Sequence, residues 1–193
     1  HITTAEGGMV VTESEEMAAR MRRFRSHGIA GDHRNREQQG TWYYEMIEPG
    51  YNYRLSDLQC ALGISQLRKL PAFLARRREI AAHYDREFAS LTTLTPLRTR
   101  PESNHARHLY VIRLPNAPAR QQAFQCLREQ GIGANVHYLP VYLHPFYREH
   151  FGHTPGLCPA AEEAYEQIIS LPIWPGMDDG QVERVAQEVR LLS

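Results

Sequence analysis

Lysine is almost absent from this sequence. Lys69 is the single lysine among the 22 basic residues of the 193-residue chain, and all the other basic side chains are arginines. A reaction that needs a lysine amine as its covalent attachment point must therefore use Lys69 or a lysine that lies outside this chain.

Paired cysteines, net charge and long apolar runs are absent as well. Cys60, Cys126 and Cys158 are far apart and form no CxxC pair, which favours reduced thiols and a cytoplasmic setting over a disulfide framework. The 22 acidic residues balance the 22 basic ones, so no overall field attracts nucleic acid or an anionic membrane. No apolar run reaches the ~18 residues of a membrane span. We therefore expect a cytoplasmic protein with no nucleic-acid partner and no membrane partner.

The first 30 residues predict a strand followed by a helix. The apolar run Met9–Thr12, after two glycines, is typical of a buried strand. Ser14 suits the N-cap of the next helix, and Gly28 suits its C-terminal stop. The apolar stripe of this helix consists of Met17, Met21 and Phe24, and we expect it to face a core. A strand followed by a helix indicates an α/β layer.

A long loop and a long helix come next. Residues 28–50 show no hydrophobic period, which predicts an ordered loop that is either functional or a surface excursion pinned by its aromatic side chains. Ser56 and Gln59 form a capping-box pair ahead of a helical pattern that continues to about Ser90. Pro71 lies inside this pattern and should kink or split the helix.

The second half of the chain predicts a small α/β domain with three strands and helices on one side. The expected strands are 108–114, 134–138 and 168–171. The expected helices are 118–131, 159–167 and a final helix that carries Val182, Val185, Ala186 and Val189 on one face.

The turn before the long helix is a candidate phosphate site. The sequence Gly-Tyr-Asn-Tyr-Arg, residues 50–54, places an amide and a guanidinium close to the free N–H groups of a helix N-terminus. The alternative is structural: Asn52 is then a turn residue, and Arg54 pairs with a carboxylate such as Asp57.

A second candidate site is a loop rich in aromatic residues and histidines. It contains His137, Tyr138, Tyr142, His144, Phe146, Tyr147, His150 and His153. These side chains suit stacking on a base or sugar and hydrogen bonding to hydroxyl groups. A metal site of His144, His150 and His153 is less favoured, because the spacing matches no standard ligand pattern. The remaining alternative is a hydrophobic loop folded over its own helix.

The order of several motifs resembles a known family over essentially the whole chain. The motifs are ITTAEGGMVVT, RSHGI, WYYEM, GYNYRLSDLQCALGISQL, RRREIAAHYD, HLYVIRL, GIGANVHYLPVYLHPFY and CPAAEEAYEQIISLPIWPGM. They resemble the DegT/DnrJ/EryC1/StrS family of pyridoxal-phosphate-dependent sugar aminotransferases. Within that family these motifs are most similar to the sequences of the branch that serves pseudaminic acid biosynthesis.

The resemblance implies an α/β fold that is the C-terminal part of a fold-type-I aminotransferase. Residues 1–70 would be the end of the large cofactor-binding domain, 71–100 a bridging helix and linker, and 101–193 a small C-terminal α/β domain. The family's cofactor-binding lysine would lie directly before His1, and Lys69 matches no position that could replace it. The family's other large-domain cofactor contacts would lie upstream with that lysine.

The resemblance also implies a reaction and a site. The cofactor would be pyridoxal 5'-phosphate, the amino donor glutamate, the acceptor a UDP-linked 4-keto-6-deoxy sugar, and the assembly a homodimer with shared active sites. Asn52 would reach the phosphate of the partner's cofactor, with Arg54 at the same rim. The residues of the nucleotide-sugar pocket would be His137, Tyr138, Leu139 and Pro140, with His144 and Tyr147 nearby.

Two alternatives stay open. The first is a sister nucleotide-sugar aminotransferase, such as one that makes 4-amino-arabinose. The second is a non-catalytic binding or dimerisation module of the same family. A lysine immediately upstream of this chain would favour an enzyme, and any other residue there would favour the module.

Overall fold

A computed structural model describes residues 1–31 and 33–192, so position 32 of the expected 28–50 loop lies outside the described residues. The chain forms two compact units, residues 2–69 and residues 70–193 together with His1. No helix within the described part of the chain is long and apolar enough to cross a membrane. The assignment of these units to a large and a small domain stays a prediction.

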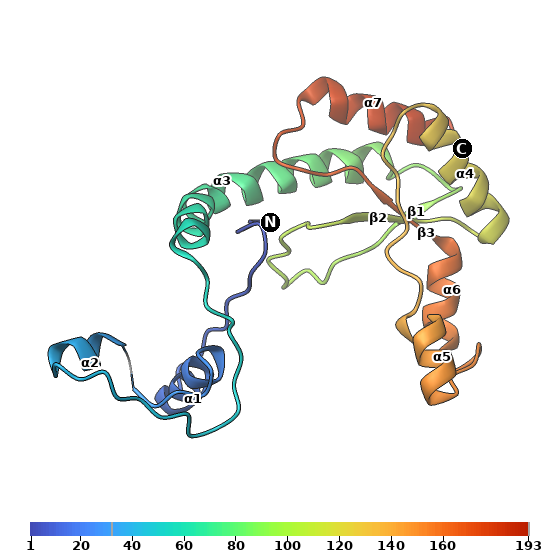
Figure 1. The fold of residues 1–193 in the computed structure, drawn as a ribbon. Coiled ribbons are helices and arrows are strands. Elements are labelled where there is room, and N and C mark those ends of the chain that lie inside the picture. Colours follow the sequence, from blue (N-terminus) through green and yellow to red (C-terminus); the bar gives the residue numbers. More distant parts are fainter. Residues whose placement is uncertain (32, 193) are drawn as a thin grey trace. The chain divides into compact units, whose positions relative to one another are not determined.

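Helix α1, Glu15–Arg25, begins where its sequence predicts (Figure 1). Ser14 accepts a hydrogen bond from the backbone N–H of Met17 at 3.2 Å, and two glutamates occupy the first turn, where the helix dipole favours negative charge. Gly28, two residues beyond the C-cap, adopts a left-handed φ of 68° and donates its N–H to Arg23 O at 2.8 Å.

Two expectations for this unit are wrong. Residues 9–12 run extended but form no strand, and Met9, Val10 and Val11 are 81%, 70% and 86% exposed. A strand requires a hydrogen-bonded neighbour, and no described segment pairs with this one. The stripe on α1 does not face a core either, because none of its residues is buried.

The loop after α1 is ordered and contains a short helix, α2, His33–Gln38. Two isolated bridges close it, Ser26 with Asn52 and Ile29 with Met46. Gly28 also packs directly against this loop, because a Cβ added there would lie 1.6 Å from Glu48 O. The expected long ordered loop is therefore present apart from its helical turn and the undescribed position 32.

Helix α3, Asp57–Glu87, runs through Pro71 without a break in its helical assignment. The capping pair predicted from the sequence is present, because Gln59 N–H donates to Ser56 Oγ at 3.4 Å and Ser56 N–H donates to Gln59 Oε1 at 2.9 Å. Pro71 was expected to kink or split the helix; it does not split it, and the boundary between the two compact units falls beside it, between Lys69 and Leu70.

The second unit is built on an antiparallel three-stranded sheet in the order β1-β2-β3. The strands are β1 Thr95–Pro96, β2 Tyr110–Arg113 and β3 Ile168–Leu171. Residues 134–138 were expected as the third strand, but they contribute a single bridge, Asn135 to Ser170. The outer place beside β2 is taken by β1, from a segment expected to be loop.

The remaining helices follow the sequence closely. They are α4 Ala117–Glu129, a 3-10 helix η1 Val141–Leu143, α5 Pro145–Phe151, α6 Pro159–Gln167 and α7 Asp179–Arg190. Helix α7 has a complete capping box between Asp178 and Gln181. The four α7 residues predicted for one face, at 182, 185, 186 and 189, are all buried.

The core of this unit lies between the sheet and helices α3, α4 and α7, of which α3 and α7 run side by side (Figure 1). Fully buried side chains from α3, β2 and β3, among them Tyr84, Ile112 and Ile169, form its centre. The hydroxyl of Tyr84 donates to Pro172 O at 3.0 Å, and burial raises the pKa of this phenol well above its ordinary value. The core therefore holds the segment that directly follows β3.

Candidate functional site

The predicted phosphate-binding turn is anchored to the end of α1. Tyr51 N–H donates to Phe24 O at 2.7 Å, and Tyr53 N–H donates to Arg25 O at 2.9 Å. The rings of Tyr51 and Tyr53 stack at 4.8 Å with an interplanar angle of 5°, and Phe24 meets Tyr51 edge-on at 5.1 Å. Paired main chain and packed aromatic rings thus hold this turn in one conformation.

Asn52 occupies the centre of the anchored turn. Side chains alternate along an extended segment, so the Asn52 amide lies on the face opposite to the stacked rings of its two neighbours. Asn52 and Arg54 are both exposed. The sequence also allowed an Arg54–Asp57 pair, and among the ion pairs of the described residues there is none between these two side chains.

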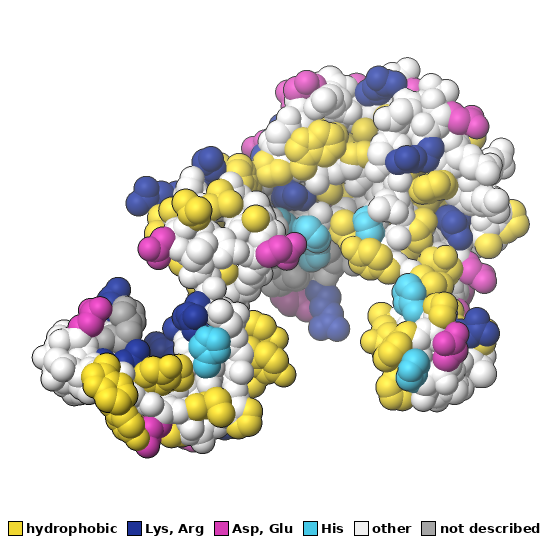
Figure 2. All heavy atoms as spheres, in the orientation of Figure 1, with side chains coloured by type: hydrophobic (Ala, Val, Ile, Leu, Met, Phe, Trp, Pro, Cys, Tyr) yellow, Lys and Arg dark blue, Asp and Glu magenta, His cyan; other side chains and the backbone are white. Residues whose placement is uncertain are grey.

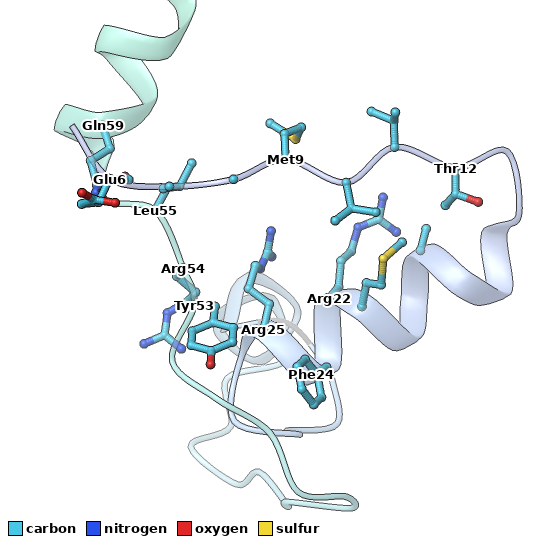
Figure 3. Close-up of a pocket in the computed structure, with 16 residues that line it drawn as sticks. Glu6, Met9, Thr12, Arg22, Phe24, Arg25, Tyr53, Arg54, Leu55 and Gln59 are labelled. Atoms are coloured by element: carbon cyan, nitrogen blue, oxygen red, sulfur yellow. Dashed lines mark hydrogen bonds between the residues drawn. The ribbon is translucent and has the colours of Figure 1, made fainter. Parts of the chain in front are cut away.

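An open groove of about 1000 Å³ lies beside this turn, lined by the extended segment 6–12, one face of α1 and residues 53–55. Arg22 and Arg25 project from α1 toward the extended segment, whereas Arg54 points away from it (Figure 3). The groove wall is otherwise largely apolar, with Met9 and Phe24 among its residues. Arginine side chains on an apolar wall suit an anionic group carried on an apolar body.

The predicted sugar-binding residues lie in the other unit. The imidazole of His137 is half-buried, with Nδ1 at 2.9 Å from Ser170 Oγ and Nε2 at 3.3 Å from Asn135 Nδ2. The ring of Tyr138 meets it edge-on at 4.5 Å and is 72% exposed. His137 and Tyr138 therefore form one surface of a fixed imidazole and an accessible phenol.

The other four predicted pocket residues follow along the chain. Leu139 and Pro140 are half-buried ahead of η1, and His144 is exposed at the N-cap of α5. Tyr147 stacks on Phe151 at 5.9 Å and on His153 at 6.5 Å. Hydrophobic and histidine side chains gather on the surface around α5 (Figure 2).

A partly exposed carboxylate contact fixes the loop that follows α5. Glu162 accepts hydrogen bonds from the Tyr142 hydroxyl and from Gly156 N–H, the latter at 2.7 Å. Tyr142 Oη in turn accepts from Cys158 N–H at 3.2 Å. The Tyr142 hydroxyl, and next the Gly156 amide, lower the pKa of Glu162 below its ordinary value.

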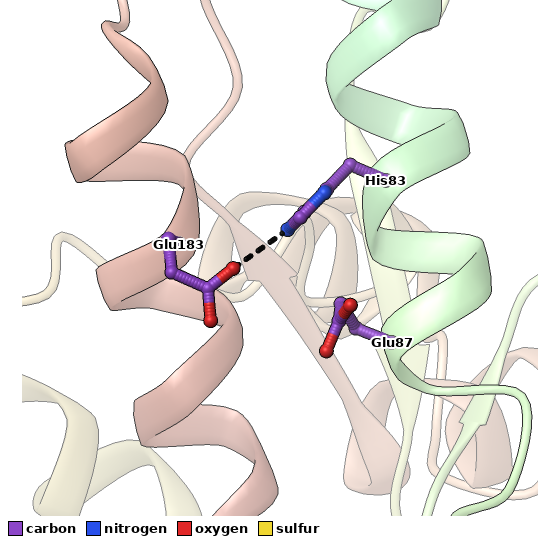
Figure 4. A group of neighbouring side chains, drawn as sticks. All are labelled: His83, Glu87 and Glu183. Carbon is purple, nitrogen blue, oxygen red and sulfur yellow. Dashed lines mark hydrogen bonds and ion pairs between the residues drawn. The ribbon is translucent and has the colours of Figure 1, made fainter.

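The histidine metal set considered from the sequence does not assemble. His150 Nδ1 is engaged at 3.0 Å by Phe146 O, and within the described residues the group able to hold a metal is a different one, His83, Glu87 and Glu183, whose ligand atoms lie within 4.8 Å of one another (Figure 4). These three side chains come from α3 and α7.

Arg190 accounts for the His83 group without a metal. Its guanidinium pairs with Glu87 and, at 2.9 Å, with Glu183, whose second oxygen lies 3.1 Å from His83 Nε2. A metal ion would have to displace this cation and bring partly exposed carboxylates closer together. The arrangement is therefore a charge network that links α3 to α7.

Three residues with clear roles could not be identified from the sequence. Ser170 sits in an apolar strand, Asn135 in a segment expected to be an ordinary strand, and Arg77 in a helix rich in arginine. Arg77 is buried and donates from Nη1 to three main-chain carbonyls. Each gains its role through a contact at least 30 residues away in the chain, which local pattern does not encode.

The fold and the motifs together define a class. Residues 1–190 match the model of the DegT/DnrJ/EryC1/StrS aminotransferase family, and the chain belongs to this family. Its α/β fold corresponds to part of a fold-type-I aminotransferase chain. Pyridoxal phosphate is the cofactor of this family, and a Streptococcus pneumoniae member, the putative sugar aminotransferase Spr1654, has been solved in PLP and PMP forms.

Particular relatives are similar along the whole chain. Helicobacter pylori PseC, described as an aminotransferase involved in the biosynthesis of pseudoaminic acid, is 35% identical with a TM-score of 0.88, over 99% of this chain and 50% of that one. The spore coat polysaccharide biosynthesis protein SpsC of Bacillus subtilis is 37% identical over 98% of this chain and 50% of its own. An uncharacterized protein of Methanocaldococcus jannaschii, MJ1066, is 43% identical over the same shares. The chain thus spans about half the length of the curated relatives it matches.

Proposed function

We propose that this chain is part of an enzyme that transfers the amino group of glutamate to C4 of a UDP-linked 4-keto-6-deoxy amino sugar, in a pathway of the pseudaminic acid type. The observation that carries the proposal is the family match over residues 1–190. The similarity to Helicobacter pylori PseC supports the choice of sugar. The three free cysteines fit a cytoplasmic enzyme.

The anchored turn is suited to the phosphate of the cofactor. Pyridoxal phosphate, when bound, supplies the carbonyl carbon that takes the amino group from the donor and gives it to the acceptor. The exposed Asn52 amide and Arg54 guanidinium can each donate hydrogen bonds to a phosphate oxygen. In a homodimer these groups would serve the cofactor of the partner subunit, because they lie on the outer surface of their own unit.

The covalent attachment point must come from elsewhere. Lys69 is exposed on α3 and lines neither the groove nor the His137 surface. We place the cofactor-binding lysine outside these 193 residues, together with the groups that hold the pyridine ring. The residues present here would then orient the cofactor phosphate and the sugar.

The His137 surface is suited to the sugar nucleotide. Tyr138 offers an accessible ring and hydroxyl, and His137 offers a fixed imidazole, the groups that recognise a base face and sugar hydroxyls. Leu139 and Pro140 would form the apolar floor, with His144 and Tyr147 at the rim. None of these groups needs to transfer a proton for this role.

The test is an assay of the intact protein with pyridoxal phosphate and glutamate, offered either the UDP-linked 4-keto-6-deoxy amino sugar or a UDP-linked 4-keto pentose. A kcat/KM for the 4-keto-6-deoxy amino sugar that is at least ~10-fold higher than the kcat/KM for the pentose supports the proposal. Preference for the pentose favours the sister enzyme that makes 4-amino-arabinose.

A variant tests the phosphate site. In Asn52→Ala the dissociation constant of the cofactor should rise about tenfold, because one charge-assisted hydrogen bond is lost. Arg20→Gln, on the exposed face of α1, is the control.

One observation favours a second function. Because the single lysine is exposed and does not line the groove beside the Asn52 turn, the chain could serve as a non-catalytic binding or dimerisation module. Such a module would bind the nucleotide sugar through the His137 surface and turn over neither sugar in the assay above.

A further inference from the structure

Ser170 is an unusual residue for its position. It lies on β3 between the core residues Ile169 and Leu171, and it is buried with 3% exposure. A buried hydroxyl needs a hydrogen-bond partner, since an unpaired one costs free energy. The partner of Ser170 is the imidazole of His137, with 2.9 Å between Oγ and Nδ1.

The main chain makes this contact rigid. Asn135 N–H donates to Ser170 O at 3.1 Å, and Ser170 N–H donates to Asn135 O at 2.7 Å. This bridge pins the segment two residues before His137 against the central part of β3. The orientation of the imidazole is therefore set by its contact with β3 and not by the exposed loop that follows it.

The second contact of the ring assigns its proton. Nε2 lies 3.3 Å from Asn135 Nδ2, and an amide nitrogen can only donate, so Nε2 accepts. In a neutral imidazole the other nitrogen then carries the hydrogen, and Nδ1–H donates to Ser170 Oγ. The hydrogen bond from Asn135 Nδ2 to His137 Nε2 is long, so a better donor can replace the amide at Nε2 at little cost in free energy.

We propose that Ser170 and Asn135 are positioning residues that hold His137 as the neutral tautomer with its proton on Nδ1, which leaves Nε2 as an acceptor for a hydroxyl group of the sugar nucleotide. The bound hydroxyl replaces the Asn135 amide at Nε2. This assignment rests on the proposed function for its ligand, whereas the state of the imidazole stands on the contacts alone. The assignment predicts that the sugar nucleotide donates a hydrogen bond from a hydroxyl group to His137 Nε2.

The tautomer is measured first. Long-range proton–nitrogen spectra of the intact protein, labelled with ¹⁵N-histidine, distinguish Nδ1–H from Nε2–H at a pH where imidazole is neutral, and His137→Gln assigns the signals. We expect Nδ1–H in the wild type and a mixture in Ser170→Ala. Asn135→Asp, which places an acceptor beside Nε2, should draw the proton to Nε2. Asn104→Asp, on an exposed loop, should leave the spectrum unchanged.

Asn135→Asp keeps the test valid if Ser170→Ala does not fold, because Asn135 is exposed and its bridge uses only main-chain atoms. An Nε2–H signal in the wild type, or no change in Asn135→Asp, overturns the assignment. These outcomes do not depend on which reaction the protein catalyses.

Steady-state kinetics then test whether His137 recognises the sugar nucleotide. Asn135→Asp and Ser170→Ala should raise the KM for the sugar nucleotide about tenfold, the loss of one hydrogen bond, while the glutamate half-reaction keeps its rate. An unchanged KM with an altered tautomer overturns the role of His137 in sugar recognition. A wild type that turns over no sugar refutes the proposed function and leaves the tautomer result standing.

Discussion

Arg77 and Ile173 are 96 residues apart in the chain, and Nη1 of the arginine donates to the main-chain oxygen of the isoleucine at 2.9 Å. The same nitrogen lies 3.2 Å from Arg107 O and 3.1 Å from His108 O. One buried side chain of α3 thus joins the segment before β2 to the segment after β3. In the antiparallel pair the start of β2 faces the end of β3, so both segments lie at the end of β3, the strand that contacts His137.

Replacement of Arg77 should destabilise the second unit. In Arg77→Met the three carbonyls lose a charged donor, and unsatisfied buried acceptors cost about 2–3 kcal/mol in total. Equilibrium unfolding in urea, followed by tryptophan fluorescence, measures this change. Arg78→Met is the matched control, because Arg78 is exposed and makes a single long contact, 3.4 Å to His105 O. Equal stability of the two variants would contradict a central role for Arg77.

The charge network between α3 and α7 should behave as a surface network and not as a metal site. Glu183→Gln removes the carboxylate that Arg190 and His83 share, and we expect a loss below about 1 kcal/mol because these groups are partly exposed. Glu188→Gln on the same helix is the control. Thermal unfolding with zinc chloride and with a chelator should give the same midpoint. A midpoint that rises with zinc in the wild type and not in His83→Gln would show a metal site.

Glu162 should make stability depend on pH in the acidic range. Its pKa lies below the ordinary value of 4.5, chiefly through the Tyr142 hydroxyl and next through Gly156 N–H. The unfolded chain therefore binds the proton more readily, so the contribution of Glu162 is present above about pH 4.5 and is lost as the pH falls through the lowered pKa. The stability difference between the wild type and Glu162→Gln should shrink over that interval. Glu166→Gln, on the same helix, is the matched control.

The elements that are predictable from the sequence are those with local signals. The capping residues Ser14, Ser56 and Asp178 lie where side-chain chemistry alone satisfies free helix N–H groups. The period of α7 specifies which of its faces is buried. Both signals depend on residues within one or two turns of each other.

The mistaken expectations concern elements whose state depends on distant partners. Residues 9–12 have the composition of a buried strand but no strand beside them among the described residues. Residues 134–138 lie beside β3 but form only one bridge there, whereas β1 pairs with β2 although its two residues include Pro96 and carry almost no strand signal. Likewise Ser170, which contacts the imidazole of His137, lies on β3, 33 residues away in the chain, so this contact was not predictable from spacing.

The exposed extended segment should drive self-association of the 193-residue chain. Met9, Val10 and Val11 present apolar side chains and unpaired main-chain groups, which together form a template for another strand. Light scattering after size-exclusion chromatography should show oligomers that decrease in Val11→Lys. Leu191→Lys, at another exposed apolar position, should have no effect. A monodisperse wild-type monomer would contradict this prediction.

The central claim is that the chain serves a pyridoxal-phosphate-dependent aminotransferase, and an absorbance scan of the native protein before and after addition of glutamate tests it most directly. We predict a visible band of bound cofactor that moves to shorter wavelength as the amino group is transferred, and that returns when the keto sugar is added. A native protein that shows no cofactor band after incubation with pyridoxal phosphate, or a band that glutamate leaves unchanged, would contradict the account.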